Sequence, residues 1–208
     1  MTVKRLELDH LVVAASTLAQ GVSWTEQKLG VKLQAGGKHA LFGTHNALLK
    51  LGEQTYLEVI AIDPDAPAPI RARWFELDHS HQLEQPKLIH WVARTQNLEA
   101  RVPAFPFLGR ILEASRGDLH WKITVPDDGH LNFGGLIPTL IHWDGVHPTT
   151  MLESSGCELL RLVGHHPEAN RLLQTLELLE ATDLLEVAKA QTPRLQALIQ
   201  TPHGIAEL

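Results

Sequence analysis

The chain has 208 residues, of which 44% are apolar and 20% charged, a composition typical of a globular protein with one or two domains. The net charge is −6 without a Lys/Arg cluster, no apolar stretch approaches the roughly 20 residues of a membrane-spanning helix, and the N-terminus lacks a signal-peptide segment, so we expect neither nucleic acid nor a membrane as partner. The single cysteine, Cys157, excludes an intramolecular disulfide and favours a cytoplasmic location.

Residues 1–64 are predicted to form one β-α-β-β-β module. Alternating apolar residues indicate a first strand over 6–14. A helix should follow, because Thr17 and Gln20 form a capping box and Gly30 stands where a helix ends. Three further strands are expected at 31–34, 44–51 and 55–62, with glycine turns between them.

Residues 65–86 are rich in proline and aspartate and are predicted to be a connecting segment. After it the first pattern returns, since Leu88-Ile89-His90 matches Leu8-Asp9-His10 at an offset of 80 residues. This repeat predicts a second module over 87–148, with a short helix at 97–102 and strands at 111–115, 119–125 and 138–143.

Residues 149–208 are predicted to be a C-terminal βαββ extension. Its strand at 157–163 leads to a helix that opens at His166-Pro167-Glu168, where proline suits the first helical position. Two strands follow at 184–189 and 194–200, and nothing in this extension suggests catalysis. The expected fold class is α+β, with two paired βαβββ modules and this extension.

The repeat brings six metal-competent side chains to equivalent strand positions. The pairs are His10 with His90 on the first strand, His45 with His120 on the third, and Glu58 with His142 on the fourth. Imidazole and carboxylate ligands suit a divalent ion such as Zn, Fe, Mn, Co or Ni. Since side chains alternate along a strand, a histidine on the concave face would place the tryptophan after it, as in His90-Trp91, in the core behind the sheet.

Each of these residues also has a purely structural interpretation. The histidines could be hydrogen-bonded core residues, and Glu58 could lie on the solvent face of its strand. Arg110 and Arg116 could either bind an anionic substrate or form exposed salt bridges. His130 and His147 are expected at the surface.

The sequence resembles the vicinal oxygen chelate superfamily, and within it the glyoxalase-like domain proteins. The resemblance covers residues 6–145 and rests on these segments: Leu8-Asp9-His10-Leu11-Val12-Val13, Leu29-Gly30-Val31, Gly43-Thr44-His45-Asn46-Ala47-Leu48-Leu49, Tyr56-Leu57-Glu58-Val59-Ile60 and Leu88-Ile89-His90-Trp91. It implies that the paired modules curl into a half-open barrel around a metal. The ligands that it implies are His10, Glu58, His90 and His142. Glyoxalase I and related epimerases usually carry an acid where this chain has His142, which leaves Glu58 as the carboxylate base.

We therefore expect a metal-dependent glyoxalase-like enzyme that acts on a small carbonyl compound by proton transfer, as a lyase or isomerase. Glu58 or a metal-bound hydroxide would take the proton, His45 would be a ligand or touch the substrate, and residues 63–86 would cover the pocket. The alternatives are an Fe(II) ring-cleaving or oxo-acid dioxygenase and a metal-free, antibiotic-type binding protein. The substrate, the metal and a monomeric or homodimeric state stay open.

Overall fold

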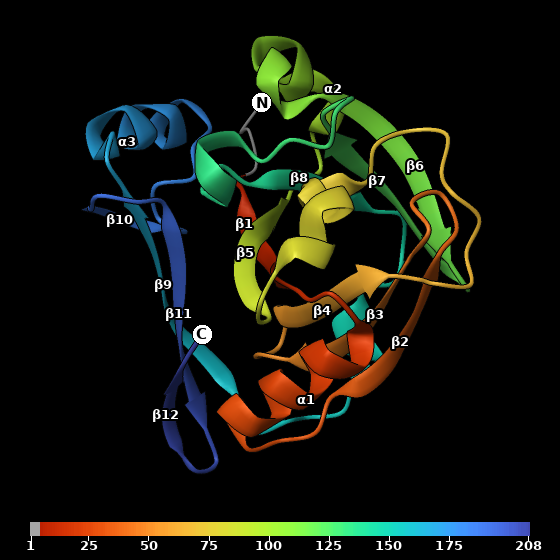
Figure 1. Cartoon of the computed structure of the whole chain (residues 1–208). Helices are drawn as coiled ribbons and strands as arrows, with labels where there is room; N and C mark the ends of the chain where they lie inside the picture. Colours follow the sequence, from red (N-terminus) through yellow and green to blue (C-terminus); the bar gives the residue numbers. More distant parts are fainter. Residues whose placement is uncertain (1–4) are drawn as a thin grey trace.

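Two β-sheets form the framework of residues 5–208, the part of the chain that the computed structural model describes (Figure 1). Three α-helices and several short 3₁₀ helices accompany them. The strands and α-helices are, in chain order, β1 (Glu7–Ala14), α1 (Leu18–Leu29), β2 (Gln34–His39), β3 (Thr44–Lys50), β4 (Tyr56–Ile62), β5 (Lys87–Arg94), α2 (Leu98–Arg101), β6 (Arg110–Arg116), β7 (Leu119–Val125), β8 (Thr139–Trp143), β9 (Glu158–His166), α3 (Ala169–Leu178), β10 (Glu186–Lys189), β11 (Arg194–Thr201) and β12 (Gly204–Glu207).

The larger sheet has the strand order β2-β3-β4-β1-β5-β8-β7-β6 and curls into a half-barrel (Figure 1). Within each module the first and fourth strands run parallel, β1 beside β4 and β5 beside β8, while the modules meet where β1 pairs antiparallel with β5. The edge strands β2 and β6 approach each other across the open side. The predicted α+β class with two paired βαβββ modules is confirmed.

Matching irregularities interrupt the central pair of strands. The register between β1 and β5 leaves Asp9 unpaired on one strand and Ile89 unpaired on the other. Both stand immediately before the histidines that the repeat aligns, His10 and His90. A β-bulge redirects the side chains beside it, so the repeated sequence carries a repeated local distortion.

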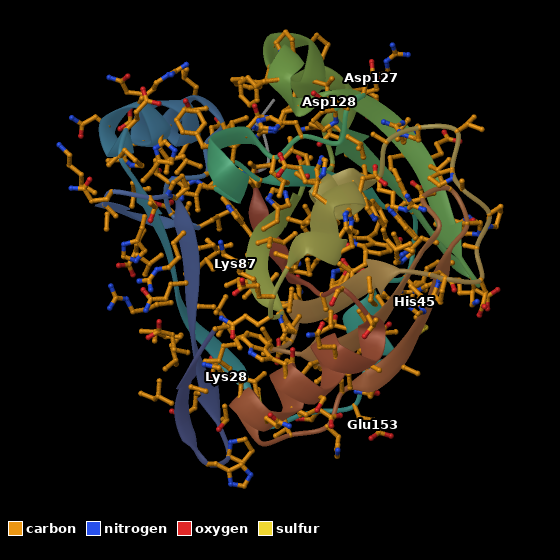
Figure 2. All side chains as sticks on the ribbon, viewed as in Figure 1. Lys28, His45, Lys87, Asp127, Asp128 and Glu153 are labelled. Atoms are coloured by element: carbon orange, nitrogen blue, oxygen red, sulfur yellow. The ribbon has the colours of Figure 1, made fainter. Side chains whose placement is uncertain are left out.

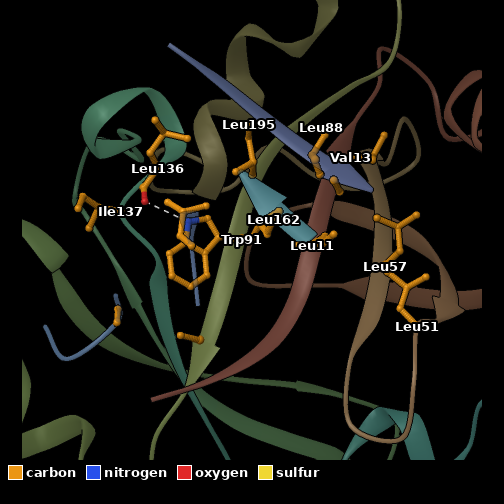
Figure 3. Close-up of a cluster of buried hydrophobic side chains, with 14 of the residues drawn as sticks. Leu11, Val13, Leu51, Leu57, Leu88, Trp91, Leu136, Ile137, Leu162 and Leu195 are labelled. Carbon is orange, nitrogen blue, oxygen red and sulfur yellow. Dashed lines mark hydrogen bonds between the residues drawn. The ribbon is translucent and has the colours of Figure 1, made fainter. Parts of the chain in front are cut away.

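The two faces of the half-barrel carry different cores. On the convex face, α1 and the four-stranded sheet of the C-terminal extension cover residues such as Leu11, Leu57 and Trp91 (Figure 3). The indole of Trp91 donates a hydrogen bond to the carbonyl of Leu136 at 3.0 Å, so its one polar atom is satisfied in this core (Figure 3). On the concave face the residues next in alternation, such as Val12, form a second core.

The expected elements are present with shifted ends. The strand predicted at 31–34 lies at Gln34–His39, and the helix predicted to open at His166-Pro167-Glu168 begins at Ala169, because His166 still belongs to β9.

The start and end of α1 agree with the sequence in part. Thr17 Oγ1 accepts from the backbone N–H of Gln20, and Gly30 ends the helix with a φ of 71°, as predicted. The side chain of Gln20 accepts from Ser16 Oγ, so the second half of the predicted capping box is not formed. The glycines at 36 and 37 lie inside β2 rather than in a turn, where the register with β3 is irregular. The strand β12 was not expected. No helix within residues 5–208 has the length and apolarity to span a membrane.

The convex core generates a test of the packing. Leu57 is fully buried there, so Leu57→Ala should lower the free energy of unfolding by about 2–5 kcal/mol through lost burial and a residual cavity. Leu178→Ala is the matched control, since that side chain is 70% exposed and its loss should change stability by less than about 0.5 kcal/mol. Chemical denaturation measures both, and equal effects would contradict the core assignment.

Candidate active site

A narrow pocket lies on the concave face of the half-barrel. Strands of both modules and the 3₁₀ helix η1 (Trp74–Gln82) contribute to it. Its polar side chains come mainly from the first module, while the second supplies mostly apolar ones. The lining residues are His10, His39, Asn46, Tyr56, Glu58, Trp74, Phe75, Arg116, Trp121, Ile123, Ile141 and Trp143.

Glu58 is the carboxylate of this pocket, and it is 5% exposed. Its side chain faces inward because Glu58 pairs with Val12, which belongs to the concave core. Oε1 accepts a hydrogen bond from Nδ2 of Asn46 at 2.6 Å, while Oε2 lies 3.6 Å from Nε2 of His10. That separation is too long for a hydrogen bond. One carboxylate oxygen is therefore fixed, and the other is available to accept a proton.

His10 turns one specific nitrogen toward Glu58. Its ring stacks on Tyr56 with centroids 4.6 Å apart, and its Nδ1 lies 2.7 Å from Oδ1 of Asp9. Burial alone would raise the pKa of Asp9, but hydrogen bonds from His10 and His147 lower it to about 2. Because Asp9 is then a carboxylate at neutral pH, Nδ1 of His10 must carry the proton that is donated, and Nε2 faces the pocket.

The carboxylate of Asp9 is fully buried and receives donors from three places in the chain. Besides His10, Trp143 Nε1 and His147 Nε2 each donate to Oδ2 at 3.0 Å. The backbone N–H of Thr149 donates to His147 Nδ1, which leaves the ring proton on Nε2. His147 was predicted at the surface, and no sequence signal marks it, since its role depends on the bulge that turns Asp9.

Two further residues of the pocket were missed. His39 hydrogen-bonds Thr44 Oγ1 at 3.0 Å, and burial, with the charge of Arg116, lowers the pKa of His39 to about 3. Asn46 follows His45 directly in the chain and takes the inward position on β3 that His45 was expected to hold. The alternation of side chains along a strand predicts that one of the two neighbours, His45 or Asn46, faces inward. It does not predict which one.

His90 does not reach the pocket as a free ligand, although it faces the concave side as expected. Its Nδ1 donates to the carbonyl of Gly135 at 2.9 Å, and its Nε2 accepts from the backbone N–H of Thr139 at 3.1 Å. Burial lowers the pKa of His90 to about 3, so the ring is neutral. The assignment of His90 as a metal ligand is thus corrected to a structural histidine with both ring nitrogens engaged.

The predicted orientations of His142, His120 and His45 are wrong. Thr139 pairs with the inward-facing Val92, which places Trp143 in the pocket and turns His142 away. His142 instead donates from Nδ1 to the carbonyl of Thr95 at 3.0 Å and lines a separate surface pocket. On β7 and β3 the predicted histidines are likewise replaced in the pocket by the residues that follow them. His120 and His45 are not among the pocket residues (Figure 2 labels His45 beside β3).

The predicted four-ligand metal centre is therefore not assembled. Within residues 5–208 the predicted ligands that bring unoccupied donor atoms together are His10 and Glu58, and a catalytic zinc-type site needs three protein ligands. Across residues 5–208 no group of three His, Cys, Asp or Glu side chains is arranged to hold a metal ion. The residues present therefore do not fit the metal that the family resemblance implies. A functional role for His10 and Glu58 stays a prediction.

The connecting segment covers the site, as expected. Its helix η1 inserts Trp74 and Phe75 into the pocket wall, and their rings stack with centroids 5.1 Å apart. Phe75 and Glu76 adopt φ values of 57° and 54°, which residues other than glycine rarely do. The carboxylate of Glu76 accepts from the N–H of Leu131 at 3.0 Å, which ties this strained turn to the second module.

Comparison with known proteins agrees with this architecture. The glyoxalase-like domain model matches residues 8–180, so the chain belongs to the glyoxalase-like domain family. Among solved structures, a hypothetical protein from Staphylococcus aureus is 12% identical with a TM-score of 0.64, and the match covers 91% of this chain and 88% of that one. Methylmalonyl-CoA epimerase from Mycobacterium tuberculosis is 17% identical with a TM-score of 0.47, covering 73% and 96%. The similarity to the Staphylococcus aureus protein shows the fold alone. No curated protein matches.

The depressed pKa of Asp9 predicts an acid-sensitive contribution to stability. Its pKa falls from 3.8 to about 2 on folding, so the carboxylate should stabilise the native state by about 2 kcal/mol above pH 4. This contribution should disappear as the pH falls from about 4 to 2, because the folded protein then also binds the proton. Unfolding free energies of wild type and Asp9→Asn, measured across this range, should converge at the acid end.

Asp183→Asn serves as the control, because that carboxylate is exposed and pairs with Arg5 on the surface. It should behave as wild type throughout. A difference between wild type and Asp9→Asn that stays constant down to pH 2 would contradict the assignment of Asp9 as a buried anion.

Proposed function

We propose that the chain is a glyoxalase-like enzyme that moves a proton on a small carbonyl compound, with Glu58 as the base. The observation that carries this proposal is the different environment of the two carboxylate oxygens of Glu58. Asn46 holds Oε1 at 2.6 Å, whereas Oε2 faces the pocket beside a histidine nitrogen. Oε2 is not among the enclosed polar atoms that lack a partner, so a ligand in the pocket can reach it.

The proton balance of the step follows from this arrangement. Oε2 of Glu58 takes the proton from the carbon next to the substrate carbonyl, and the electron pair of the broken C–H bond moves onto the carbonyl oxygen as an enolate. Nε2 of His10 can then accept a hydrogen bond from the new O–H of Glu58 after a small approach. Return of the proton to the same or the neighbouring carbon completes an isomerisation.

The apolar wall of the pocket supports this chemistry. Trp121, Ile123 and Ile141 face Glu58 from the second module and restrict water around it. Exclusion of water strengthens the interactions between the base and its substrate. A divalent ion held by His10 and Glu58 alone would lack a third protein ligand, so no step of the proposal depends on it.

A metal-free binding protein is the second candidate, favoured by the saturated ring of His90 and the outward position of His142. If the second module took part in catalysis, the ring nitrogens of these two histidines would be expected to face the pocket without protein partners. The dioxygenase alternative has less support, because it needs two histidines and a carboxylate around Fe(II), and the described residues bring one histidine to Glu58.

Exchange of substrate hydrogen with solvent distinguishes the two candidates. Untagged protein in D₂O is incubated with a panel of small carbonyl compounds that carry a C–H next to the carbonyl, and ¹H NMR follows the loss of that signal. Wild type should exchange at least one compound, and Glu58→Gln should slow this exchange about 100-fold or more while binding persists. Repeating the assay after chelator treatment tells whether a metal contributes.

Glu177→Gln is the matched control, since Glu177 lies exposed on α3, away from the pocket. It should exchange at the wild-type rate. If compounds bind the wild-type protein but none exchanges hydrogen, the enzyme hypothesis is rejected in favour of the binding protein. If exchange is unchanged in Glu58→Gln, Glu58 is not the base.

A further inference from the structure

Arg116 is the cation of the pocket, and the described part of the chain gives it no acidic partner. It lies half-buried at the end of β6 and lines the pocket, and among residues 5–208 no carboxylate lies within 4.0 Å of its guanidinium. Arg110 on the same strand behaves differently, because it is exposed and pairs with Asp127 at 3.0 Å. An arginine held at a pocket without a counter-ion is a ready site for an anion.

Trp74 adds a second donor without an acceptor. Its Nε1–H is buried and has no hydrogen-bond partner among the described residues, although Trp74 lines the same pocket. The indole is held by stacking against Phe42 at 4.0 Å and Phe75 at 5.1 Å, with His39 edge-on at 5.0 Å. A buried donor that is fixed and unpaired is best satisfied by an acceptor atom of a ligand.

The amide of Asn46 sets the spacing between this donor group and the base. Its Oδ1 accepts from Nη1 of Arg116 at 2.9 Å, and its Nδ2 donates to Glu58 at 2.6 Å. The cation and the base thus lie at the two ends of one side-chain amide. A ligand that spans them needs an anionic group and an acidic C–H only a bond or two apart.

We propose that the pocket takes small 2-oxo acids, with the substrate carboxylate on Arg116 and the Trp74 indole, and with the C–H on carbon 3, next to the keto group, facing Glu58. The carboxylate part of this assignment stands on the unpaired arginine and indole alone. The orientation of the C–H toward Glu58 rests on the proposed function. Asn46 then acts as a positioning residue for both ends of the substrate.

Binding of a matched pair of probes tests the proposal without turnover. Pyruvate and its neutral amide, pyruvamide, have nearly the same shape and differ in the negative charge. Isothermal titration calorimetry on wild type should show pyruvate binding at least tenfold more tightly than pyruvamide. Arg116→Gln should abolish this preference, and Arg110→Gln should retain it, because Arg110 is paired at the surface.

Arg116→Lys separates the charge from the structure of the site, since it keeps the cation and should keep a preference for pyruvate. Equal affinities of the two probes for wild type, absence of binding by both, or a preference that survives Arg116→Gln would each overturn the proposal. A preference lost as completely in Arg116→Lys would do the same. These results are independent of Glu58→Gln, which should bind pyruvate while failing to exchange hydrogen.

Discussion

The buried carboxylate of Asp9 is the interaction on which the site depends. It stands on a bulge of β1 and draws together His10 beside it, Trp143 at the end of β8 and His147 in the following loop. A charge without solvent access is tolerated only when such donors surround it. These contacts join the two modules and, through His10, decide which imidazole nitrogen faces Glu58.

The two modules share a fold but contribute different kinds of side chain to the pocket. The matched histidines show this most clearly, since Nε2 of His10 faces the pocket while both nitrogens of His90 are bound to backbone groups. The first module supplies the carboxylate of Glu58, which we propose as the base, and the second lines the pocket with Trp121 and neighbouring apolar residues. A duplicated scaffold has thus kept its geometry while concentrating the reactive groups on one side.

Much of the fold could be predicted because it depends on repetition and on local rules. The offset of 80 residues between the modules, the cap at Thr17 and the left-handed Gly30 are all visible in the chain. The site was harder, because the face of each strand depends on its register with its neighbour. His10 and Glu58 line the pocket where the sequence places them, whereas Asn46 takes the inward position that was expected for its neighbour His45. The contribution of His147 depends on tertiary contacts across 138 residues, which no local pattern contains.

Asp9 fixes His10 with its proton on Nδ1 and with Nε2 turned to Glu58. Nitrogen NMR of the histidine rings, assigned with His10→Gln and recorded near pH 8.5, where an ordinary histidine is about 99% neutral, measures this directly. The expected spectrum shows a His10 ring whose protonated Nδ1 exchanges slowly with solvent, and in Asp9→Asn the ring should revert to an ordinary mixture of tautomers. A His10 ring that carries its proton on Nε2 in the wild type would contradict this role of Asp9.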